Sequence, residues 1–323
     1  MENDLNISLQ GFNNEDDAQK IGNLALEVIK ALETEHQLNI VKLKKVVVSF
    51  DFPSALAQIA EEFNHQSLPT FTDSKQAIAI AQLLSKPADN GRLSEYALVL
   101  SISFFSEIIT TDGAISFDNI APIIHRIHHE LIHVHEHNEN SLDNSKIIDD
   151  YDDALLMTGK RAWSEYLANY MSSSTATDDC IHDVLNTLET VLSEVPIEIE
   201  DLVYRYQIKL LPLAEMHYKV TERIKLIANM YGYAQGYIQA LDIDMEAHFP
   251  KLQHLQSSSK LASPLSDLGE AIDSIKAKFE EHGLDHYNDF NSATSAIAEM
   301  YSAFGLRIER NAKPNTGLYV HVG

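Results

Sequence analysis

The chain has 323 residues, of which 45% are hydrophobic, enough for one large or two ordinary folded domains. The formal net charge of −24 argues against a nucleic-acid backbone as the main partner. Cys180 is the only cysteine, which excludes an intrachain disulfide and a thiolate metal cluster. Residues 1–12 do not resemble a secretory signal, and the longest apolar run is too short for a membrane span. We therefore expect a cytoplasmic protein with neither membrane nor nucleic-acid partners.

The N-terminal half alternates between helical and β-branched patterns. Helical periodicity and turn signals predict helices at 15–36, 54–63, 73–85 and 118–137. β-branched runs predict strands at 41–52 and 94–105. Asp118 or Asn119 is the expected cap of the histidine-rich helix, with Pro122 in its first turn.

The C-terminal half is almost wholly helical in pattern. A long helix is expected at 147–173, with an interruption at Gly159, followed by a linker at 172–179. Further helices are expected at 180–194, 197–211, 213–245 and 265–282, with one or two extended segments in the tail. These patterns predict an α+β fold with two domains, residues 1–175 and a mostly helical 176–323.

Six histidines and two glutamates lie between His125 and His137. Within this segment, HELIH matches the motif H-E-x-x-H, which places His129 and His133 on one helical face where both can reach one Zn²⁺. Glu130 is then placed to deprotonate a metal-bound water. A rival register, H-x-x-E-H, uses His133, Glu136 and His137 instead.

Helical phase favours the first register. Six apolar residues share one side, which is the expected core face, and His129 and His133 point nearly opposite to it. These six residues are Ile120, Ile123, Ile124, Ile127, Leu131 and Val134. Phase also permits the inverted motif, but that motif falls in the last helical turn, where its geometry would be looser. For Glu136 and His137 we favour a solvated helix face.

A catalytic zinc needs a third protein ligand, and the segment EYLAN supplies a candidate. Glu165 lies on the second predicted helix, and Asn169 follows one turn later. This spacing lets Glu165 bind the metal while Asn169, without touching the metal, orients a ligand histidine through a hydrogen bond.

The pair of motifs HELIH and EYLAN resembles the gluzincin metallopeptidases, and among these it is most similar to the compact ImmA/IrrE-like group. The resemblance covers roughly residues 40–175. It implies a minimal zincin-like core, zinc ligands His129, His133 and Glu165, and Glu130 as general base. It also implies that the strand at 94–105 is an edge strand that pairs with an extended peptide substrate.

The expected activity is limited proteolysis of a specific protein, with the helical C-terminal half available to bind a protein partner. The oxyanion donor that this chemistry needs cannot be ranked among Tyr166, Tyr204, Arg205, Tyr206 and His217. His125, His128 and His135 are expected to be a mixture of surface and packed side chains. The alternatives are a non-catalytic metal-binding or interaction module on a peptidase scaffold, and a nickel or copper storage site.

Overall fold

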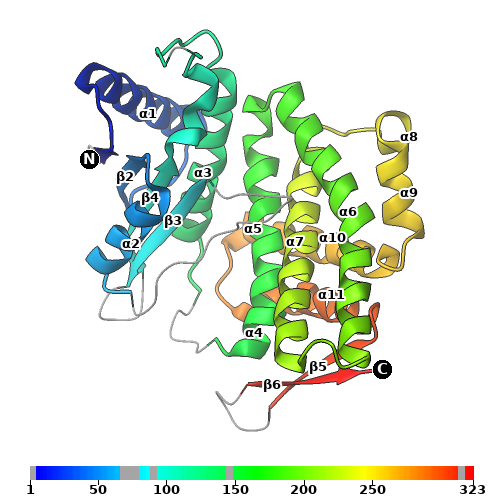
Figure 1. Cartoon of the computed structure of the whole chain (residues 1–323). Coiled ribbons are helices and arrows are strands. Elements are labelled where there is room, and N and C mark those ends of the chain that lie inside the picture. Colours follow the sequence, from blue (N-terminus) through cyan, green and yellow to red (C-terminus); the bar gives the residue numbers. More distant parts are fainter. Residues whose placement is uncertain (1–4, 66–79, 88–92, 112, 143–147, 312–316) are drawn as a thin grey trace. The chain divides into compact units, whose positions relative to one another are not determined.

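The computed structural model describes residues 5–65, 80–87, 93–111, 113–142, 148–311 and 317–323 (Figure 1). The chain forms two compact units, the first made of Met1–Ser145 with Ser174–Thr177 and the second of Lys146–Ser173 with Asp178–Gly323. This division differs from the domain boundary expected after residue 175. The helix that carries Glu165 has its packing partners in the second unit, so it belongs there.

The first unit contains a four-stranded sheet with the strand order β1-β2-β4-β3. Its strands are β1 (Asn6–Gln10), β2 (Leu43–Ser49), β3 (Ala81–Pro87) and β4 (Leu93–Ser101). β1 and β4 run parallel to β2, whereas β3 pairs antiparallel with β4. β4 is therefore an inner strand and β3 is the edge strand next to it. The expectation that the strand at 94–105 forms the edge was wrong.

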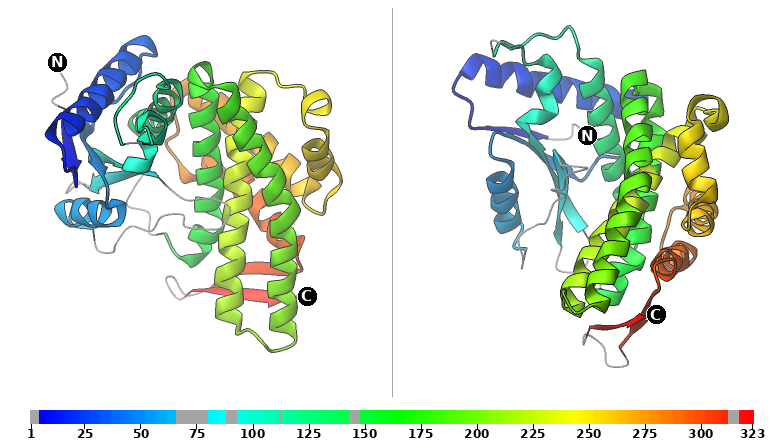
Figure 2. Two further views of the ribbon diagram at one scale, coloured as in Figure 1. Left: turned by 45° about the horizontal axis from the view of Figure 1, so that its top comes forward. Right: turned by 45° about the vertical axis from the view of Figure 1, so that its right-hand side comes forward.

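Both faces of this sheet are covered by helices (Figure 2). The helices are α1 (Glu15–Glu35), α2 (Phe52–Glu62) and α3 (Ala121–Glu139), and a 3-10 helix, η1 (Ile102–Ile108), follows β4. α2 packs on the face that presents Val47 and Val99. On the other face, Leu9 approaches Gly22 of α1. Because both faces are buried, β2 and β4 read as nearly continuous apolar runs instead of alternating ones.

Several predicted elements of this unit are confirmed and others are corrected. The helices at 15–36 and 54–63 and the strands at 41–52 and 94–105 are present, although residues 102–108 turn into η1. The helix expected at 73–85 is wrong over its last five residues, which lie in β3 because their backbone pairs with β4; residues 73–79 lie outside the described residues. β1 was not predicted.

The start of α3 also differs from the expected cap. Ile120 is the N-cap residue and no side chain caps the helix, whereas Pro122 lies in its first turn as expected. Asp118 instead accepts a hydrogen bond from the Ser116 hydroxyl at 2.6 Å. Pro122 is the second residue of α3, where its fixed φ suits the first turn and its missing amide hydrogen would have no helical partner.

The second unit is a helical assembly with one β-hairpin. Its long helices are α5 (Leu156–Ser172), α6 (Asp178–Gln207), α7 (Leu213–Ala240) and α10 (Ala262–His282). The shorter ones are α4 (Asp150–Ala154), α8 (Met245–His248), α9 (Pro250–Ser258) and α11 (Asn291–Ser302), with 3-10 turns η2 (Ser173–Thr175), assigned to the first unit from Ser174 on, and η3 (Tyr287–Phe290). None of the helices in the described ranges combines the length and apolarity that crossing a bilayer requires.

The elements expected in this unit need two main corrections, and one is confirmed. The long helix breaks at Leu155 and not at Gly159, which packs inside α5 against Ala293. The helices expected at 180–194 and 197–211 are one helix, α6, which continues through Pro196 because buried residues on both sides hold it in place. The extended tail is confirmed as an antiparallel hairpin, β5 (Leu306–Arg310) with β6 (Leu318–Val322).

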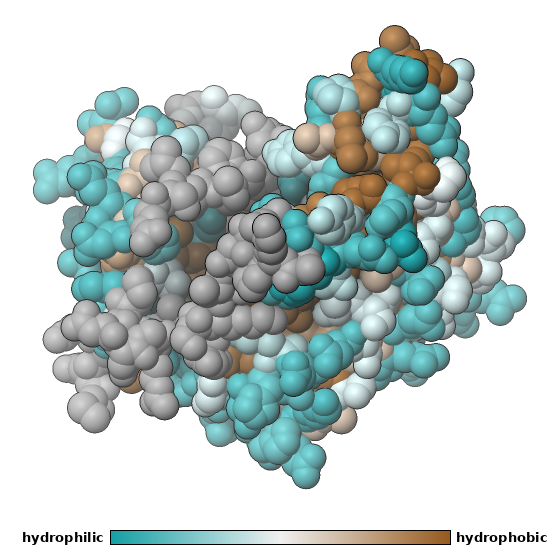
Figure 3. Space-filling model, turned by 90° about the horizontal axis from the view of Figure 1, so that it is seen from below, coloured by the Kyte–Doolittle hydropathy of each residue, from teal (hydrophilic) through white to brown (hydrophobic). Residues whose placement is uncertain are grey.

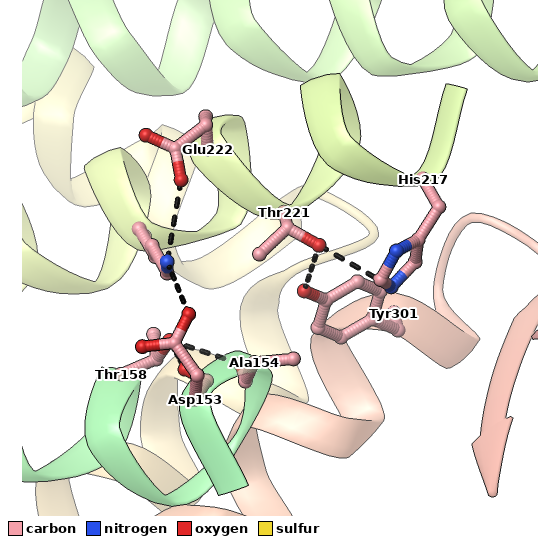
Figure 4. A network of polar contacts seen from close by, with 8 residues as sticks. Asp153, Ala154, Thr158, His217, Thr221, Glu222 and Tyr301 are labelled. Carbon is pink, nitrogen blue, oxygen red and sulfur yellow. Dashed lines mark hydrogen bonds and ion pairs between the residues drawn. The ribbon is translucent and has the colours of Figure 1, made fainter. Parts of the chain in front are cut away.

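A polar network ties α4, α7 and α11 together (Figure 4). Lys225 of α7 forms an ion pair with Asp153 at 2.9 Å. Tyr301 of α11 donates a hydrogen bond to Thr221 at 2.9 Å, and the Thr221 hydroxyl lies 3.4 Å from Nε2 of His217. Burial is the main cause that lowers the pKa of His217, so this network holds a neutral imidazole at neutral pH.

The hairpin is fixed to the start of α4 by Arg310. Its guanidinium forms ion pairs with Asp149 and Asp152, the latter at 2.6 Å, and lies over the Tyr151 ring at 4.7 Å. Asp149 is also the N-cap of α4, because its carboxylate accepts the Asp152 amide hydrogen. One arginine therefore joins the C-terminal strand pair to the helix that leads into α5.

Close backbone packing brings α5 against α7. A Cβ atom at Gly232 would lie 2.1 Å from the Ala162 carbonyl oxygen, and one at Gly236 would lie 2.6 Å from the Tyr166 carbonyl oxygen. No side chain fits at either position, since real contacts of Cβ with backbone oxygen are longer than about 3 Å. The spacing of four residues puts both glycines on one face of α7.

This contact predicts a large effect of Gly232→Ala. Alanine normally stabilises a helix relative to glycine by about 1 kcal/mol, but here the two helices must separate. We expect the free energy of unfolding to fall by about 3 kcal/mol or more, measured by chemical denaturation. Gln235→Ala, one turn along the same helix, is the matched control and should change it by less than about 0.5 kcal/mol. A stabilised Gly232→Ala protein would contradict this packing.

Candidate metal site

α3 is buried around most of its circumference, which is more than the single core face expected from the sequence. Ile123, Ile127, Leu131 and Val134 are buried, as predicted, but so are His125, His128, His129 and Glu136. Ile120 and Ile124 are only half-buried. The helix therefore carries polar groups into an enclosed environment, where each must find a hydrogen-bond partner or a ligand.

His129 and His133 face each other one turn apart on α3. Their Nε2 atoms are 3.2 Å apart, and their ring centroids are 4.9 Å apart with an interplanar angle of 84°. Two imidazoles that bind one tetrahedral Zn²⁺ at 2.0–2.1 Å bring their nitrogens to about 3.3 Å from each other. The pair therefore already has the separation of a two-histidine chelate. Glu130 follows His129 on the same helix and is half-buried.

Glu165 and Asn169 lie one turn apart on α5. Their neighbours Trp163, Tyr166 and Leu167 are buried, while Glu165 itself is half-buried. Asn169 is only 2% exposed, and its amide donates a hydrogen bond to the Tyr233 carbonyl of α7 at 2.9 Å. This bond, together with the glycine contact, fixes the rotation of α5 about its own axis.

The three residues predicted as zinc ligands form a group that could hold a metal ion. One ligand atom from each of His129, His133 and Glu165 lies within 4.8 Å of the other two. Two neutral nitrogens and one carboxylate are a donor set that Zn²⁺ accepts, with a fourth position left for water or substrate. The donors present therefore fit the metal that the sequence predicts.

Three further histidines of α3 are held by contacts inside the first unit. The Thr175 hydroxyl lies 3.2 Å from Nδ1 of His125 and 3.0 Å from Nδ1 of His128. Nδ1 of His135 accepts the Asn39 backbone amide hydrogen at 2.9 Å. His125 and His128 are buried and His135 is half-buried, which agrees with the expected mixture of packed and surface side chains.

His128 is the most enclosed of these residues. Burial lowers its pKa to about 3, and the neighbouring His36, His125 and His129 add to the shift. The His36 ring lies against it at a centroid distance of 4.0 Å. Since two rings on one tetrahedral ion stand about 5 Å apart, this closer pair, tilted by 38°, does not have the form of a chelate.

The residues of the rival motif lie differently from the expected solvated face. Glu136 is fully buried and His137 half-buried, so the expectation was wrong for Glu136. The Asn140 amide donates to Glu136 at 3.3 Å, and the His137 ring lies 5.6 Å from the Tyr96 ring of β4. Burial, with the nearby Glu136 charge as a second cause, raises the pKa of Tyr96 to about 12. Both residues therefore contact the sheet side of the unit.

Two of the five oxyanion candidates are engaged in other hydrogen bonds within the second unit. Tyr166 is buried and donates its hydroxyl hydrogen to Gln239 at 2.6 Å, and His217 belongs to the network with Thr221. The others, Tyr204, Arg205 and Tyr206, lie in the last turns of α6.

Tyr233 was not among these candidates, although helical phase places it beside Glu165. α5 and α7 run in the same direction where they touch, because Gly232 meets Ala162 and Gly236 meets Tyr166. At 100° per residue, Tyr233 turns to the same side of this helix pair as Glu165, and its Cα lies two residues, about 3 Å, before the level of Glu165 along the helices. The sequence signal was the Gly232–Gly236 spacing, which marks the α7 face that meets another helix.

Comparisons with protein-family models, with curated proteins and with solved structures returned no match for this chain. The gluzincin resemblance therefore continues to depend on the two motifs and on the geometry of their side chains.

The site geometry predicts which histidines carry metal affinity. His129→Ala should weaken Zn²⁺ binding by about 100-fold or more, because one imidazole of the preformed pair is lost. His137→Ala, which removes the second histidine of the rival motif, should leave the affinity within about threefold, since its ring lies against Tyr96 of β4. Competition with a zinc-sensitive dye measures both. A large loss in His137→Ala with none in His129→Ala would favour the inverted register.

Proposed function

We propose that the protein is a gluzincin-like zinc metallopeptidase with ligands His129, His133 and Glu165 and with Glu130 as general base. The observation that carries the proposal is the His129–His133 pair, whose Nε2 atoms stand 3.2 Å apart, in a group with Glu165 whose ligand atoms lie within 4.8 Å. The sequence order of H-E-x-x-H followed by a helix with a third carboxylate supports the same class.

The arrangement of the first unit is compatible with a minimal zincin-like core. α3, the helix with the motif, packs against the edge strand β3 and against η1. β3 runs antiparallel to its neighbour β4 and has a partner on one side only within the described sheet. An extended peptide could add to the outer side of β3 through backbone hydrogen bonds, so β3 takes over the role that the sequence had suggested for β4.

When bound, Zn²⁺ supplies a Lewis acid that polarises a peptide carbonyl and lowers the pKa of water. The chain itself supplies the acid–base chemistry. The Glu130 carboxylate accepts a proton from the attacking water and returns it to the leaving amine. His129 and His133 contribute neutral imidazoles on a rigid helix, which keeps their positions fixed during the reaction.

The tetrahedral intermediate of peptide hydrolysis carries an oxyanion that needs a hydrogen-bond donor. We assign this role to the Tyr233 hydroxyl. Tyr233 is half-buried on the Glu165 side of the α5–α7 pair, and its backbone carbonyl is held by Asn169. A phenol on a helix whose rotation is fixed can stabilise developing charge without a large reorganisation.

Glu130→Gln tests the general base. Zinc content should stay at the wild-type level, whereas kcat on a quenched-fluorescent peptide library should fall by about 100-fold or more. Mass spectrometry for metal and fluorescence for cleavage give the two readings. The alternative, a non-catalytic metal-binding module, would be supported by a different result. In that case the wild-type protein and the variant would bind zinc equally and neither would cleave any peptide.

Tyr233→Phe tests the oxyanion donor. It removes one hydroxyl and keeps the ring, so kcat should fall by roughly 10²–10³ while KM and zinc content change little. Tyr170→Phe is the matched control, because Tyr170 stacks on Tyr166 and lies under Lys276, away from the Glu165 side. An unchanged kcat in Tyr233→Phe would exclude this role and leave the zinc assignment standing.

A further inference from the structure

The turn that joins α6 to α7 exposes an unusual amount of apolar surface. Six of the twelve large hydrophobic side chains that are strongly exposed in the described structure fall between residues 197 and 218. Figure 3 shows hydrophobic residues gathered on a projection at the upper right of the view. We define the apolar tip by Tyr204, Ile208, Leu210, Leu213 and Tyr218, which are 37–67% exposed.

Two hydrogen bonds fix the backbone conformation of this tip. The Leu210 amide hydrogen bonds to the Arg205 carbonyl and the Lys209 amide to the Tyr206 carbonyl, with Lys209 in the left-handed region at φ 63°. These two bonds form a Schellman motif. The apolar residue after such a cap commonly packs back on its own helix, yet Leu210 is 67% exposed. Leu211 is buried instead, and it anchors the turn.

Along the helix axes, the aliphatic side chains of the tip lie at its end and the tyrosines lie behind them. Ile208, Leu210 and Leu213 lie in or next to the turn. Tyr204 precedes Ile208 by four residues and Tyr218 follows Leu213 by five, so the tyrosines stand about 6–8 Å further back along the helices. Aliphatic groups at the end and tyrosines one turn behind match the depth profile of a bilayer interface, where helices enter by about 5–10 Å.

The charge of the tip is opposite to that of the chain. Residues 204–218, which span the apolar tip, contain Arg205 and Lys209 against the single acidic residue Glu215, within a chain of net charge −24, and Arg205 also lies 3.7 Å from Asp201 one turn earlier. Lysine and arginine extend their alkyl stems along apolar surface and place the charge at the phosphates of a lipid headgroup layer. A second copy of this acidic chain would be repelled, whereas anionic phospholipid is attracted locally.

We propose that the apolar tip inserts into the headgroup region of a phospholipid bilayer and attaches the second unit to that surface. This peripheral attachment involves no membrane-spanning helix and departs from the sequence-based expectation of no membrane partner. It is independent of the metal site, because none of the tip residues lies on α3 or α5.

Vesicle binding tests the proposal with the full-length protein. We expect co-sedimentation with vesicles of phosphatidylcholine and phosphatidylglycerol, and weaker binding to pure phosphatidylcholine, because Arg205 and Lys209 favour anionic headgroups. The triple variant Ile208→Gln, Leu210→Gln, Leu213→Gln should lose at least about tenfold in partitioning. Leu241→Gln, an exposed leucine at the other end of α7, is the matched control and should bind like wild type.

A fluorescent reporter makes the depth measurable. Trp163 is the single tryptophan and is fully buried, so Tyr204→Trp should add a signal that shifts to the blue when vesicles are added. Absence of binding to both vesicle types, or equal binding of the triple variant, would overturn the proposal. So would a tip-dependent dimer in sedimentation analysis without vesicle binding, since it would make a second copy the occupant. Because the substituted side chains are exposed, circular dichroism should be unchanged.

Discussion

The contact between α5 and α7 through Gly232 and Gly236 is the constraint on which the second unit depends. Because glycine has no side chain, the two backbones can touch at these positions. The contact then fixes the axial position and the rotation of α5 relative to α7. Glycine in a helix costs about 1 kcal/mol each relative to alanine, and this cost is offset by the packing of Ala162 and Tyr166 against α7. The same contact determines which side of α5 presents Glu165, and it brings Tyr233 to that side. The candidate chemistry of this unit therefore follows from a packing requirement that involves no catalytic side chain.

In the first unit the corresponding constraint is the burial of α3. A helix with six histidines would be easier to stabilise in water, but His125, His128 and His129 are enclosed. Enclosure favours the neutral imidazole, as the low pKa of His128 illustrates. Neutral imidazole is also the form that binds metal. The burial that destabilises charge on this helix thus keeps its nitrogens available as ligands, while hydrogen bonds from Thr175 and Asn39 hold the neighbouring rings in place.

Hydrophobic side chains are buried around the histidines of α3 but exposed at the apolar tip. On α3, buried apolar neighbours surround His128 and Glu136 and so strengthen the polar interactions they enclose. At the turn after α6, the apolar side chains are themselves exposed, and the hydrogen-bonded cap keeps them so. Exposed aliphatic groups on an ordered turn lose little conformational entropy when they bind, because the backbone is already arranged. Proteolysis at a membrane surface would unite the two proposals, although neither requires the other.

Features that depend on residues close together in the sequence were easier to predict than features that depend on distant ones. The i, i+4 geometry of His129 and His133 depends on one helix, and it was predicted correctly because the helical period alone determines it. The edge strand was assigned wrongly because β3 is recognised only through its pairing with β4, and a short apolar run such as residues 80–84 suits helix and strand equally. Glu136 was misjudged because the enclosure of α3 depends on elements distant in sequence. Tyr233 could have been found only by treating the two glycines of α7 as a packing face and then following the helical rotation by one residue. The local geometry of the histidine pair was therefore predictable, whereas the errors at β3 and Glu136 concerned which distant segment lies against them.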